Sequence, residues 1–353
     1  MSTLRTGLVG YGFIAERGHV PAYLSGKAPF HVTAVAESCH ARWPLIERML
    51  PAARLYPDHR TMLAMEQLDV VDICTPPSSH AEIALAAFEH GAHVLCEKPL
   101  AMDGREARHM VAAAQRAGRV LYPGHSYRFA PVMRAARSAL ESGRLGKVHL
   151  ATVATYRTTH ARGVSEWNPD WRRDPKFSGG GILMDHGPHT FYLAFDWLGG
   201  YPSEASAEIA TRGGGAVEDD VVTTLHFPDG GLLRSHLTWN ASFRKVIYTI
   251  HGERGGLRIE DDELEVITKG ADGHVHSERS ASASHWMDAG HGPWFEGLLV
   301  DFARAISAPD LIHVETEDSV RAMEAIEAAY ASARVYGRPV TLGNALGSRR
   351  AAA

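Results

Sequence analysis

The sequence predicts an α/β protein of two domains, the first built on a parallel sheet and the second an α+β domain with a large, mostly antiparallel sheet. Its 353 residues are enough for two domains of ordinary size. The first third alternates short β-branched runs with longer helical patterns, which is typical of βαβ units. After Lys147, alternating runs follow one another with little helix between them, which indicates antiparallel strands. We therefore expect a first domain over residues 1–124, a second over 125–343 and a tail over 344–353.

In the first domain, expected strands and helices alternate along the chain. The strands are expected over residues 6–9, 31–36, 70–74, 93–96 and 120–122, and the helices over 14–25, 43–49, 80–89 and 104–117. The helix over 80–89 shows the reasoning, because its apolar residues recur with the period of one helix face. Gly91 follows it where a helix end favours a positive φ.

The second domain is expected to contain strands within residues 149–156, 205–211, 221–227, 232–239 and 246–251. Residues 227–231, F-P-D-G-G, separate two of these runs and predict a hairpin turn. Two helices, over 294–307 and 316–336, close the chain. An antiparallel sheet can leave one face free for a partner, a substrate or another subunit. We therefore expect a homodimer or homotetramer.

The composition argues against several classes of function. The chain has 36 Lys and Arg against 41 Asp and Glu, a net charge of −5, so no general basic surface for nucleic acid is expected. Cys39, Cys74 and Cys96 include no CxxC pair, which argues against a disulfide framework and a zinc–thiolate cluster. No apolar run approaches the ~18 residues of a membrane span, and no signal peptide precedes the first strand. We expect a cytoplasmic protein that binds neither nucleic acid nor membrane.

Four histidines in the last third of the chain raise the question of a metal site. Their spacing fits no common pattern of metal ligands, and they lie in a loop-like segment rich in Ser, Ala and Gly. No metal site is therefore predicted from His274, His276, His285 and His291.

A glycine-rich turn follows the first expected strand. Residues 10–15 read G-Y-G-F-I-A and match the pattern G-x-G-x-x-A of dinucleotide-binding units. The first glycine suits the tight turn, the second lets the backbone approach a pyrophosphate, and the small alanine lets the next helix pack against the strand. The alternative is a plain glycine turn. We predict a Rossmann domain in which this turn binds a dinucleotide through Gly10, Tyr11, Gly12, Phe13 and Ile14.

Glu37 ends the second expected strand, 22 positions after Ala15. An acid at this place grips the hydroxyls of the adenosine ribose, and it would repel a 2′-phosphate. Glu37 therefore predicts NAD as the cofactor. NADP stays possible, because Ser38, His40 and Arg42 follow closely and could accommodate a phosphate if Glu37 turned away.

Polar residues also follow two later strands of the parallel sheet. Glu97-Lys98-Pro99 comes directly after the strand over 93–96, and Thr75-Pro76 follows the strand over 70–74. Open α/β sheets bind ligands at this edge. The alternative for Lys98 is a solvated loop lysine. We predict that Thr75, Pro76, His80, Glu97 and Lys98 contact the cofactor.

A triple glycine at 179–181 precedes an expected helix that carries Asp185 and His189. We expect the glycines to let the backbone approach the cofactor. The i, i+4 spacing places Asp185 and His189 on one face of the helix, where the Asp could orient an imidazole acting as a base. The alternative is a surface pair. Pro188 interrupts the pattern and predicts either a kink at 184–188 or a helix that begins nearer Gly187.

Taken together, these motifs resemble the Gfo/Idh/MocA family of oxidoreductases. The resemblance extends from about residue 5 to 342, and the matching stretches are G-L-V-G-Y-G-F-I-A, C-T-P-P-S-S-H, G-A-H-V-L-C-E-K-P-L-A and W-R-R-D-P-K-F-S-G-G-G-I-L-M-D-H-G-P-H. It implies a Rossmann domain followed by an α/β domain with a large mixed sheet. It also implies hydride transfer between nicotinamide and a secondary alcohol or ketone of a sugar, inositol or related polyol.

By position, the resemblance implies that Lys98, Asp185 and His189 are the catalytic residues and that all three line the substrate site. We predict that Lys98 and His189 handle the proton and that Asp185 orients His189. Four further residues are predicted to contact the substrate: Tyr127, Arg128, Trp171 and Arg172. For Arg128 an interdomain salt bridge is the alternative, and for Trp171 ordinary packing. Pro188 departs from the family, which commonly has a branched apolar residue there.

The sequence therefore predicts an NAD(P)-dependent dehydrogenase or reductase that acts on CH–OH groups of a cyclic polyol or sugar-like substrate. Two alternatives remain open. One is a glycosidase that oxidises C3 transiently and regenerates its NAD. The other is a catalytically silent regulator that binds a dinucleotide, against which the presence of Lys98, Asp185 and His189 together argues.

Overall fold

The structure, a computed structural model, describes residues 3–270, 272–282, 292–308, 310 and 312–342. The predicted tail over 344–353, His285 and His291 lie outside the described residues. The chain packs into two compact units, each assembled from separate stretches of sequence. The first contains Met1–Ser126, Ala161–Gly179 and Ala289–Val320, and the second contains Tyr127–His160, Gly180–Asp288 and Arg321–Ala353. The predicted domain boundary between residues 124 and 125 stays a prediction.

The first unit is built on a six-stranded sheet in the order β3-β2-β1-β4-β5-β6, in which every neighbouring pair is parallel. The strands are β1 (Leu4–Val9), β2 (Phe30–Ala36), β3 (Arg54–Tyr56), β4 (Val70–Ile73), β5 (His93–Cys96) and β6 (Leu121–Pro123). This order is the one found in doubly wound dinucleotide-binding folds. The predicted parallel sheet is therefore confirmed, with β3 as a strand that the sequence analysis did not identify.

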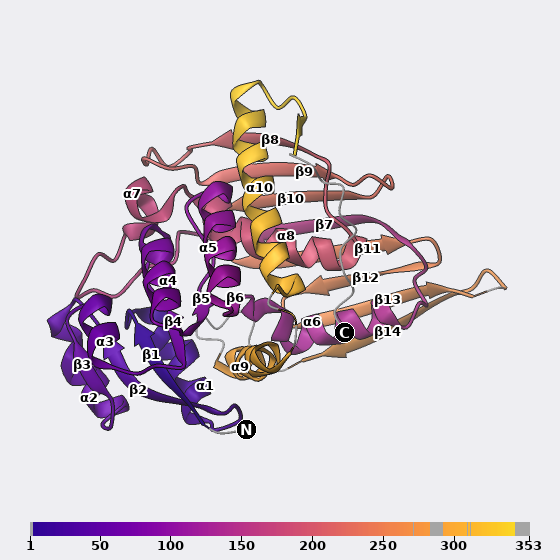
Figure 1. Ribbon diagram of the computed structural model, residues 1–353. Helices are drawn as coiled ribbons and strands as arrows, with labels where there is room; N and C mark the ends of the chain where they lie inside the picture. The colour runs from indigo at the N-terminus through magenta and orange to yellow at the C-terminus, as the bar shows by residue number, and fades with distance from the viewer. Residues whose placement is uncertain (1–2, 271, 283–291, 309, 311, 343–353) are drawn as a thin grey trace. The chain divides into compact units, whose positions relative to one another are not determined.

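The helices of this sheet begin and end where local chemistry predicts. They are α1 (Val20–Leu24), α2 (Trp43–Met49), α3 (His59–Met65), α4 (His80–Glu89) and α5 (Gly104–Ala117). The side chain of Asp103 caps the start of α5, and Gly118 ends it with a φ of +61°. Figure 1 shows α4 and α5 packed side by side along the sheet. The predicted helices over 43–49, 80–89 and 104–117 are confirmed.

Two helical segments differ from the predictions. The expected single helix over 14–25 contains a π-helical turn over Ala15–His19, and only then continues as α1. Such turns are uncommon and occur frequently at functional sites. Helix α3 was not predicted, although the Asp58 carboxylate accepts a hydrogen bond from the Thr61 amide, an ordinary N-cap.

The second unit is built on a nine-stranded sheet in the order β14-β13-β12-β11-β7-β10-β9-β8-β15. Its strands are β7 (Val148–Tyr156), β8 (Glu204–Ala210), β9 (Asp220–His226), β10 (Leu232–Thr238), β11 (Lys245–Gly252), β12 (Gly255–Glu260), β13 (Glu263–Lys269), β14 (Val275–Ala281) and β15 (Val340–Thr341). Only the pair β7–β10 is parallel, so the predicted antiparallel character is confirmed. The predicted hairpin turn joins β9 to β10, and Gly230 has a φ of +87°.

Two helices belong wholly to the second unit, α6 (Pro131–Glu141) and α8 (Ile182–Leu198). Helix α8 packs against β7, β9 and β10, and Figure 1 shows it lying along these strands. Almost all of its residues are buried, among them Phe191, Tyr192 and Phe195. Burial on this scale fixes α8 on the sheet, and with it the position of the predicted Asp185 and His189.

Two helices close the described chain. Helix α9 (Gly292–Ser307) belongs to the first unit, where Phe302 stacks on Phe30 with ring centroids 5.4 Å apart. Helix α10 (Val314–Arg334) stops short of its predicted end at residue 336. Tyr336 has a φ of +59°, which a helical residue cannot adopt.

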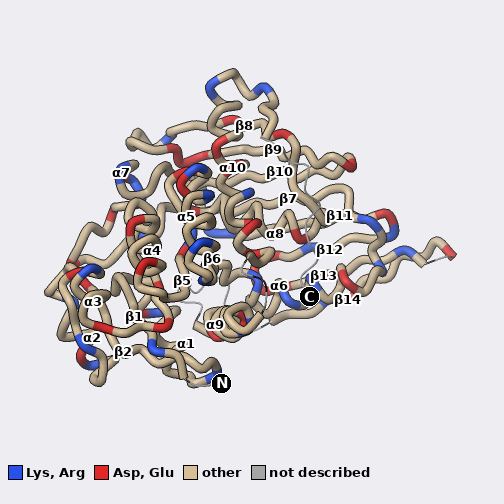
Figure 2. The backbone as a smooth tube through the Cα atoms, in the orientation of Figure 1, with Lys and Arg blue, Asp and Glu red and all other residues tan. Residues whose placement is uncertain are grey.

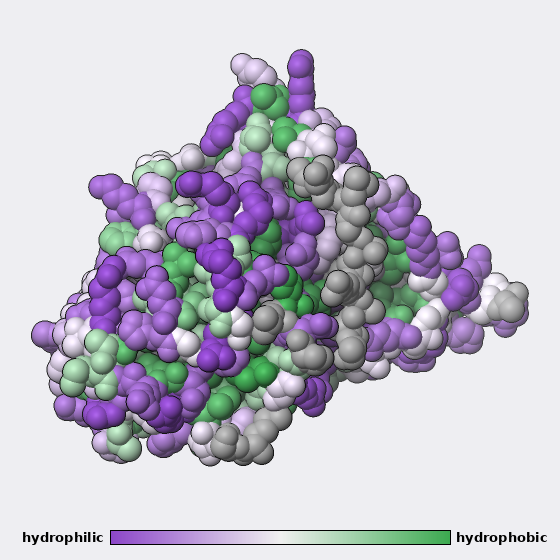
Figure 3. Space-filling view, viewed as in Figure 1, coloured by the Kyte–Doolittle hydropathy of each residue, from purple (hydrophilic) through white to green (hydrophobic). Residues whose placement is uncertain are grey.

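The described surface carries charges of both signs. Figure 2 shows acidic and basic residues interspersed along the backbone, in keeping with the net charge of −5. The face shown in Figure 3 mixes hydrophilic and hydrophobic residues. Among the described residues, no helix combines the length and the apolar character that crossing a membrane requires.

Candidate active site

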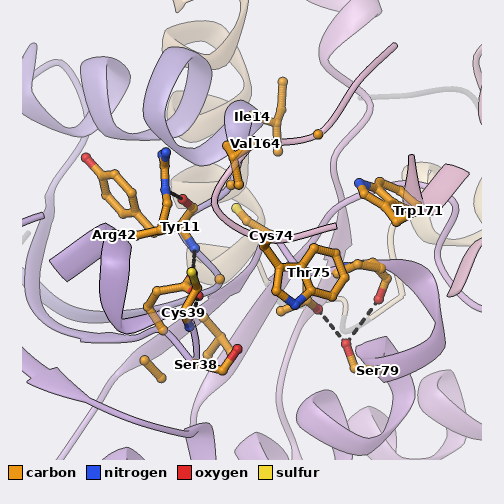
Figure 4. Close-up of a pocket in the computed structure, with 18 of the residues that line it drawn as sticks. Tyr11, Ile14, Ser38, Cys39, Arg42, Cys74, Thr75, Ser79, Val164 and Trp171 are labelled. Atoms are coloured by element: carbon orange, nitrogen blue, oxygen red, sulfur yellow. Dashed lines mark hydrogen bonds between the residues drawn. The ribbon is translucent and has the colours of Figure 1, made fainter. Parts of the chain in front are cut away.

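A pocket of about 290 Å³ opens in the first unit at the carboxyl ends of its parallel strands. Its walls come from the turn after β1, the residues after β2, the residues after β4 and a returning segment, residues 163–172. Figure 4 shows side chains from all four stretches around one space. Eight of the predicted cofactor-binding residues line it: Gly10, Tyr11, Gly12, Phe13, Ile14, Glu37, Thr75 and Pro76.

The glycine-rich turn has the geometry that its sequence requires. Gly10 has a φ of +85°, and a Cβ atom there would lie 2.8 Å from the Thr75 methyl group. Gly12 differs, because a Cβ atom there would meet nothing within 4 Å. Its backbone therefore faces open space that a pyrophosphate could approach closely, as the pattern predicts. The turn fits a dinucleotide.

The Glu37 carboxylate lies against the backbone of this turn. One oxygen accepts a hydrogen bond from the Tyr11 amide and the other from the Cys39 amide, each at 2.6 Å. The carbonyl oxygen of Glu37 accepts a further bond from the Trp43 indole at 2.9 Å. These bonds fix the residue at the pocket wall, where the sequence analysis expected an acid to meet the adenosine ribose.

Arg42 was one of the three residues, with Ser38 and His40, that could have accommodated a 2′-phosphate. It is 4% exposed, and its guanidinium pairs with Glu16 at 2.6 Å and with Glu166 at 2.8 Å. Its Nε donates to the Tyr11 carbonyl at 3.1 Å. These contacts occupy donor groups of the Arg42 guanidinium that a 2′-phosphate would need. The arrangement therefore favours NAD over NADP.

The returning segment contributes residues that the sequence analysis assigned elsewhere. Trp171 and Arg172, predicted to bind substrate, line the same pocket as the glycine turn, and the guanidinium lies 4.3 Å from the centre of the Trp171 ring. The analysis did not identify Val164 or Glu166. No spacing rule links them to the turn, since more than 120 residues separate Arg42 from Glu166 and only the folded chain pairs them.

The remaining three predicted cofactor contacts lie off this pocket. His80 is fully buried, and its ring nitrogens lie 3.0 Å from the Pro99 carbonyl and 2.8 Å from that of Thr75. Burial lowers the pKa of His80, and the ring links the loops that carry Thr75 and Pro99. Glu97 is 6% exposed and accepts the Lys98 amide at 3.1 Å, while Lys98 itself is half-buried.

Two of the three glycines, Gly180 and Gly181, allow close packing within the second unit, while the expected approach of the glycines to the cofactor stays a prediction. A Cβ atom at Gly181 would overlap the Glu218 carbonyl, and one at Gly180 would overlap the Tyr330 hydroxyl. One Glu218 carboxylate oxygen accepts bonds from the Gly181 amide at 2.8 Å, the Leu183 amide at 3.1 Å and the Tyr330 hydroxyl at 2.8 Å. The glycines therefore make room for Glu218, which caps the start of α8.

This cap also decides where α8 begins. The helix starts at Ile182 and runs through Pro188, so the alternative start near Gly187 is wrong. Pro188 costs the helix one backbone hydrogen-bond donor. The Glu218 carboxylate, in contrast, accepts hydrogen bonds from two amides at the start of the helix, so the helix can begin before the proline. The predicted kink at 184–188 stays a prediction.

His189 is held by two tyrosines. Its ring stacks on Tyr127, with centroids 3.7 Å apart and planes 7° from parallel, and its Nδ1 lies 2.9 Å from the Tyr192 hydroxyl. The histidine is 5% exposed. Tyr192 was not predicted, although its position three residues after His189 placed it on the same helix face.

Asp185 and Arg128 have partners in the same unit. An Asp185 oxygen lies 3.7 Å from the His186 ring. The Arg128 Nε lies 3.5 Å from an Asp196 oxygen, and its guanidinium is 5.1 Å from the centre of the Tyr192 ring. Arg128 thus lies beside the tyrosine that contacts His189. The predicted roles of Asp185 and Arg128 toward His189 and the substrate stay predictions.

Comparison with known proteins identifies the family. Residues 4–125 match the model of an oxidoreductase family with an NAD-binding Rossmann fold, and residues 133–258 match the GFO/IDH/MocA C-terminal domain. The chain belongs to the Gfo/Idh/MocA oxidoreductase family. The predicted family, fold class and enzyme class are confirmed, and so is the NAD-binding Rossmann fold.

Several members of the Gfo/Idh/MocA family are similar over most of the chain. The 1,5-anhydro-D-fructose reductase of Ensifer adhaerens is 37% identical over 257 residues, covering 72% of this chain and 74% of the relative. The levoglucosan dehydrogenase of Pseudarthrobacter phenanthrenivorans is 28% identical, covering 92% and 90%. A solved structure of levoglucosan dehydrogenase with NADH and levoglucosan superposes with a TM-score of 0.84 at 25% identity, covering 97% of this chain and all of that one.

We predict that Glu218→Ala lowers the free energy of unfolding of the second unit by about 2–3 kcal/mol, because two buried amides and a buried hydroxyl lose their acceptor. Urea unfolding measures the change. Glu208→Ala, at an exposed position on β8, is the control and should change stability by less than about 0.5 kcal/mol. Equal stability of both variants would contradict the capping role.

We predict that Glu37→Ala raises the KM for NAD at least tenfold and weakens the preference for NAD over NADP, because the ribose loses its acceptor and the repulsion of a 2′-phosphate disappears. Initial rates with both cofactors measure the ratio. Glu89→Ala, an exposed glutamate on α4, should leave the ratio unchanged. An unaltered ratio in Glu37→Ala would show that Glu37 does not select the cofactor.

Proposed function

We propose that this chain is an NAD-dependent dehydrogenase or reductase that transfers a hydride between nicotinamide and a secondary alcohol or ketone of a cyclic, sugar-like substrate. The observation that carries the proposal is the pocket of the first unit. It combines the glycine turn, a Glu37 carboxylate hydrogen-bonded to that turn, and an Arg42 paired with Glu16 and Glu166. The chain also belongs to an NAD-binding oxidoreductase family. The substrate class rests on relatives named for levoglucosan, 1,5-anhydro-D-fructose and D-glucosides.

Each part of the dinucleotide has a proposed partner in the chain. The backbone of Gly12 would face the pyrophosphate, because the space beside it is open. The Glu37 carboxylate would accept hydrogen bonds from the adenosine ribose, and Trp171 would lie against the cofactor from the returning segment. Bound NAD supplies the hydride acceptor in oxidation, and NADH supplies the donor in reduction.

The proton of the substrate hydroxyl needs an acceptor of its own. We assign it to Lys98 and His189, with the lysine also stabilising negative charge on the substrate oxygen. Stacking on Tyr127 and the contact with the Tyr192 hydroxyl restrict the His189 ring to one orientation. Asp185, one helical turn earlier, would favour the protonated imidazole through its charge. Tyr127, Arg128 and Arg172 are proposed to contact the substrate.

We predict that Lys98→Ala and His189→Ala each lower kcat at least a hundredfold while the Kd for NAD changes by less than threefold, because neither side chain lines the dinucleotide pocket. The assay follows NADH absorbance with levoglucosan, myo-inositol, D-glucose and methyl glucosides, and the reverse reaction with 1,5-anhydro-D-fructose. Wild-type rates in both variants would contradict the assignment. Sugar release without net NADH would instead indicate the glycosidase reaction.

We also propose that the chain forms a homodimer or homotetramer through the outer face of the nine-stranded sheet. Along β7 the buried residues Ala151, Val153 and Thr155 alternate with less buried, mostly uncharged ones. The less buried residues of β7 form the outer face of the sheet. On this face Thr152 and Thr249 of β11 lie side by side, with their hydroxyl oxygens 2.5 Å apart. The exposed Arg234 of β10 and Arg258 of β12 flank this pair, so the proposed contact with a second copy combines an uncharged centre with two arginines beside it.

We predict that Thr249→Lys dissociates this assembly, because it would add a further cation beside Arg258 at the centre of the interface. Sedimentation velocity should give a smaller species for Thr249→Lys than for the wild type. Glu208→Lys, on the sheet's periphery, is the control. A monomeric wild type, or an unchanged mass in the variant, would contradict the proposed interface.

A further inference from the structure

A buried charged cluster lies behind the loop that carries Lys98. His19 comes from the π-helical turn, Asp72 from β4, and Glu97 from the residue after β5. The His19 Nδ1 is 2.7 Å from an Asp72 oxygen, and its Nε2 is 3.0 Å from a Glu97 oxygen. His19 and Asp72 are fully buried and Glu97 nearly so. None of the three lines the dinucleotide pocket.

The contacts require a positively charged imidazole. Carboxylates only accept hydrogen bonds, so a ring between two of them donates from both nitrogens. Burial opposes the charge, but the interactions of the ring with Asp72 and Cys74 together outweigh it and raise the pKa of His19 well above its usual value. Burial likewise tends to raise the pKa of Glu97, but the hydrogen bond and charge of His19 lower it overall.

The other groups around His19 support the same charge state. The Tyr23 hydroxyl of α1 donates to the Asp72 oxygen at 2.9 Å, and burial holds the pKa of Tyr23 well above its usual value. Burial also raises the pKa of the Cys74 thiol, which therefore stays protonated. From α9 the neighbour is the uncharged Phe295 ring, 4.4 Å from the imidazole.

His19, Asp72 and Cys74 also lie close enough together to suggest metal ligands. The direct contact of 2.7 Å between His19 and Asp72 leaves no space for an ion between them. The cluster is therefore better explained as an ion-paired hydrogen-bond network.

The network ends on the backbone of Lys98. One Glu97 oxygen faces His19 and the other accepts the Lys98 amide at 3.1 Å. Gly124 packs closely against Glu97, because a Cβ atom there would lie 2.9 Å from the carboxylate oxygen that faces His19. The next residue, Pro99, is tied through its carbonyl to His80. The loop therefore has little freedom on either side of Lys98.

We propose that His19 is a positioning residue for the reaction: bridged between Asp72 and Glu97, it fixes the backbone from which Lys98 reaches the substrate oxygen. His19 itself touches neither substrate nor cofactor. The inference rests on the proposed role of Lys98 and extends it, because a neutral or absent ring would leave two buried carboxylates facing each other without a counter-charge. The geometry needed for proton transfer would then be lost while the dinucleotide pocket stayed intact.

The test compares His19→Gln and Glu97→Gln with the wild type, using the sugar that the panel above shows to be oxidised fastest. We expect each variant to lower kcat at least tenfold and to change the Kd for NAD by less than threefold. The double variant His19→Gln/Lys98→Ala should be no slower than Lys98→Ala, because both changes act on one step. His90→Gln, at an exposed position after α4, is the matched control.

Several outcomes separate positioning from a purely structural role. A structural role would lower kcat and the fraction of NAD-binding protein together, and its effect would multiply with that of Lys98→Ala. Wild-type kcat in His19→Gln, with Lys98→Ala inactive, overturns the inference and leaves the proposed function standing. Wild-type kcat in Lys98→Ala overturns the proposed function itself.

Two readouts do not depend on turnover. Nitrogen-15 NMR of the wild type should show both His19 nitrogens protonated at pH 8, and a neutral ring would overturn the bridge. The raised pKa of His19 also fixes the sign of a stability effect. Below about pH 6.5, the free energy of unfolding of the wild type should exceed that of His19→Gln by its full amount. This difference should shrink as the pH rises through the raised pKa of His19. A difference that grows with pH would contradict the charged bridge.

Discussion

The first unit depends on a close approach between the turn after β1 and the residue after β4. At Gly10 a side chain would overlap Thr75, and the positive φ at that position excludes most other residues as well. The parallel alignment of β1 with β2 and β4 brings the two turns and Glu37 to the same edge of the sheet. The glycine turn, Glu37 and Thr75 therefore form one side of the pocket, and residues 163–172 line the other.

Two networks of ion pairs in the described part of the first unit lie near the site, one partly exposed at the pocket and one buried behind the Lys98 loop. At the pocket, Arg42 is held between Glu16 and Glu166, and the Glu37 carboxylate lies against the backbone of the glycine turn. Behind the Lys98 loop, His19 is held between Asp72 and Glu97. Buried ions are costly unless each is paired, and both networks place a cation between two carboxylates. One network bears on cofactor choice and the other on the position of the reacting lysine.

Local sequence rules predicted the parts of the molecule that local chemistry controls. The parallel sheet, helices α2, α4 and α5, and the glycine turn follow from periodicity, caps and φ requirements that are visible within a few residues. The alternating runs after Lys147 predicted the antiparallel sheet of the second domain, and the family resemblance agreed with them. The contacts of Arg42 with Glu166 and of Gly181 with Glu218 join residues far apart in the chain, so no spacing could have predicted them. The triple glycine shows the consequence: the sequence indicated a close approach, but only the fold shows that the approaching group is Glu218.

We propose that the pocket of the first unit selects NAD through Glu37 while Arg42 is engaged by Glu16 and Glu166. Isothermal titration calorimetry of the wild-type protein with NAD and with NADP tests it most directly. We expect one dinucleotide-binding site in the chain, with a Kd for NAD at least tenfold lower than the Kd for NADP. Equal affinities, or tighter binding of NADP, would contradict it.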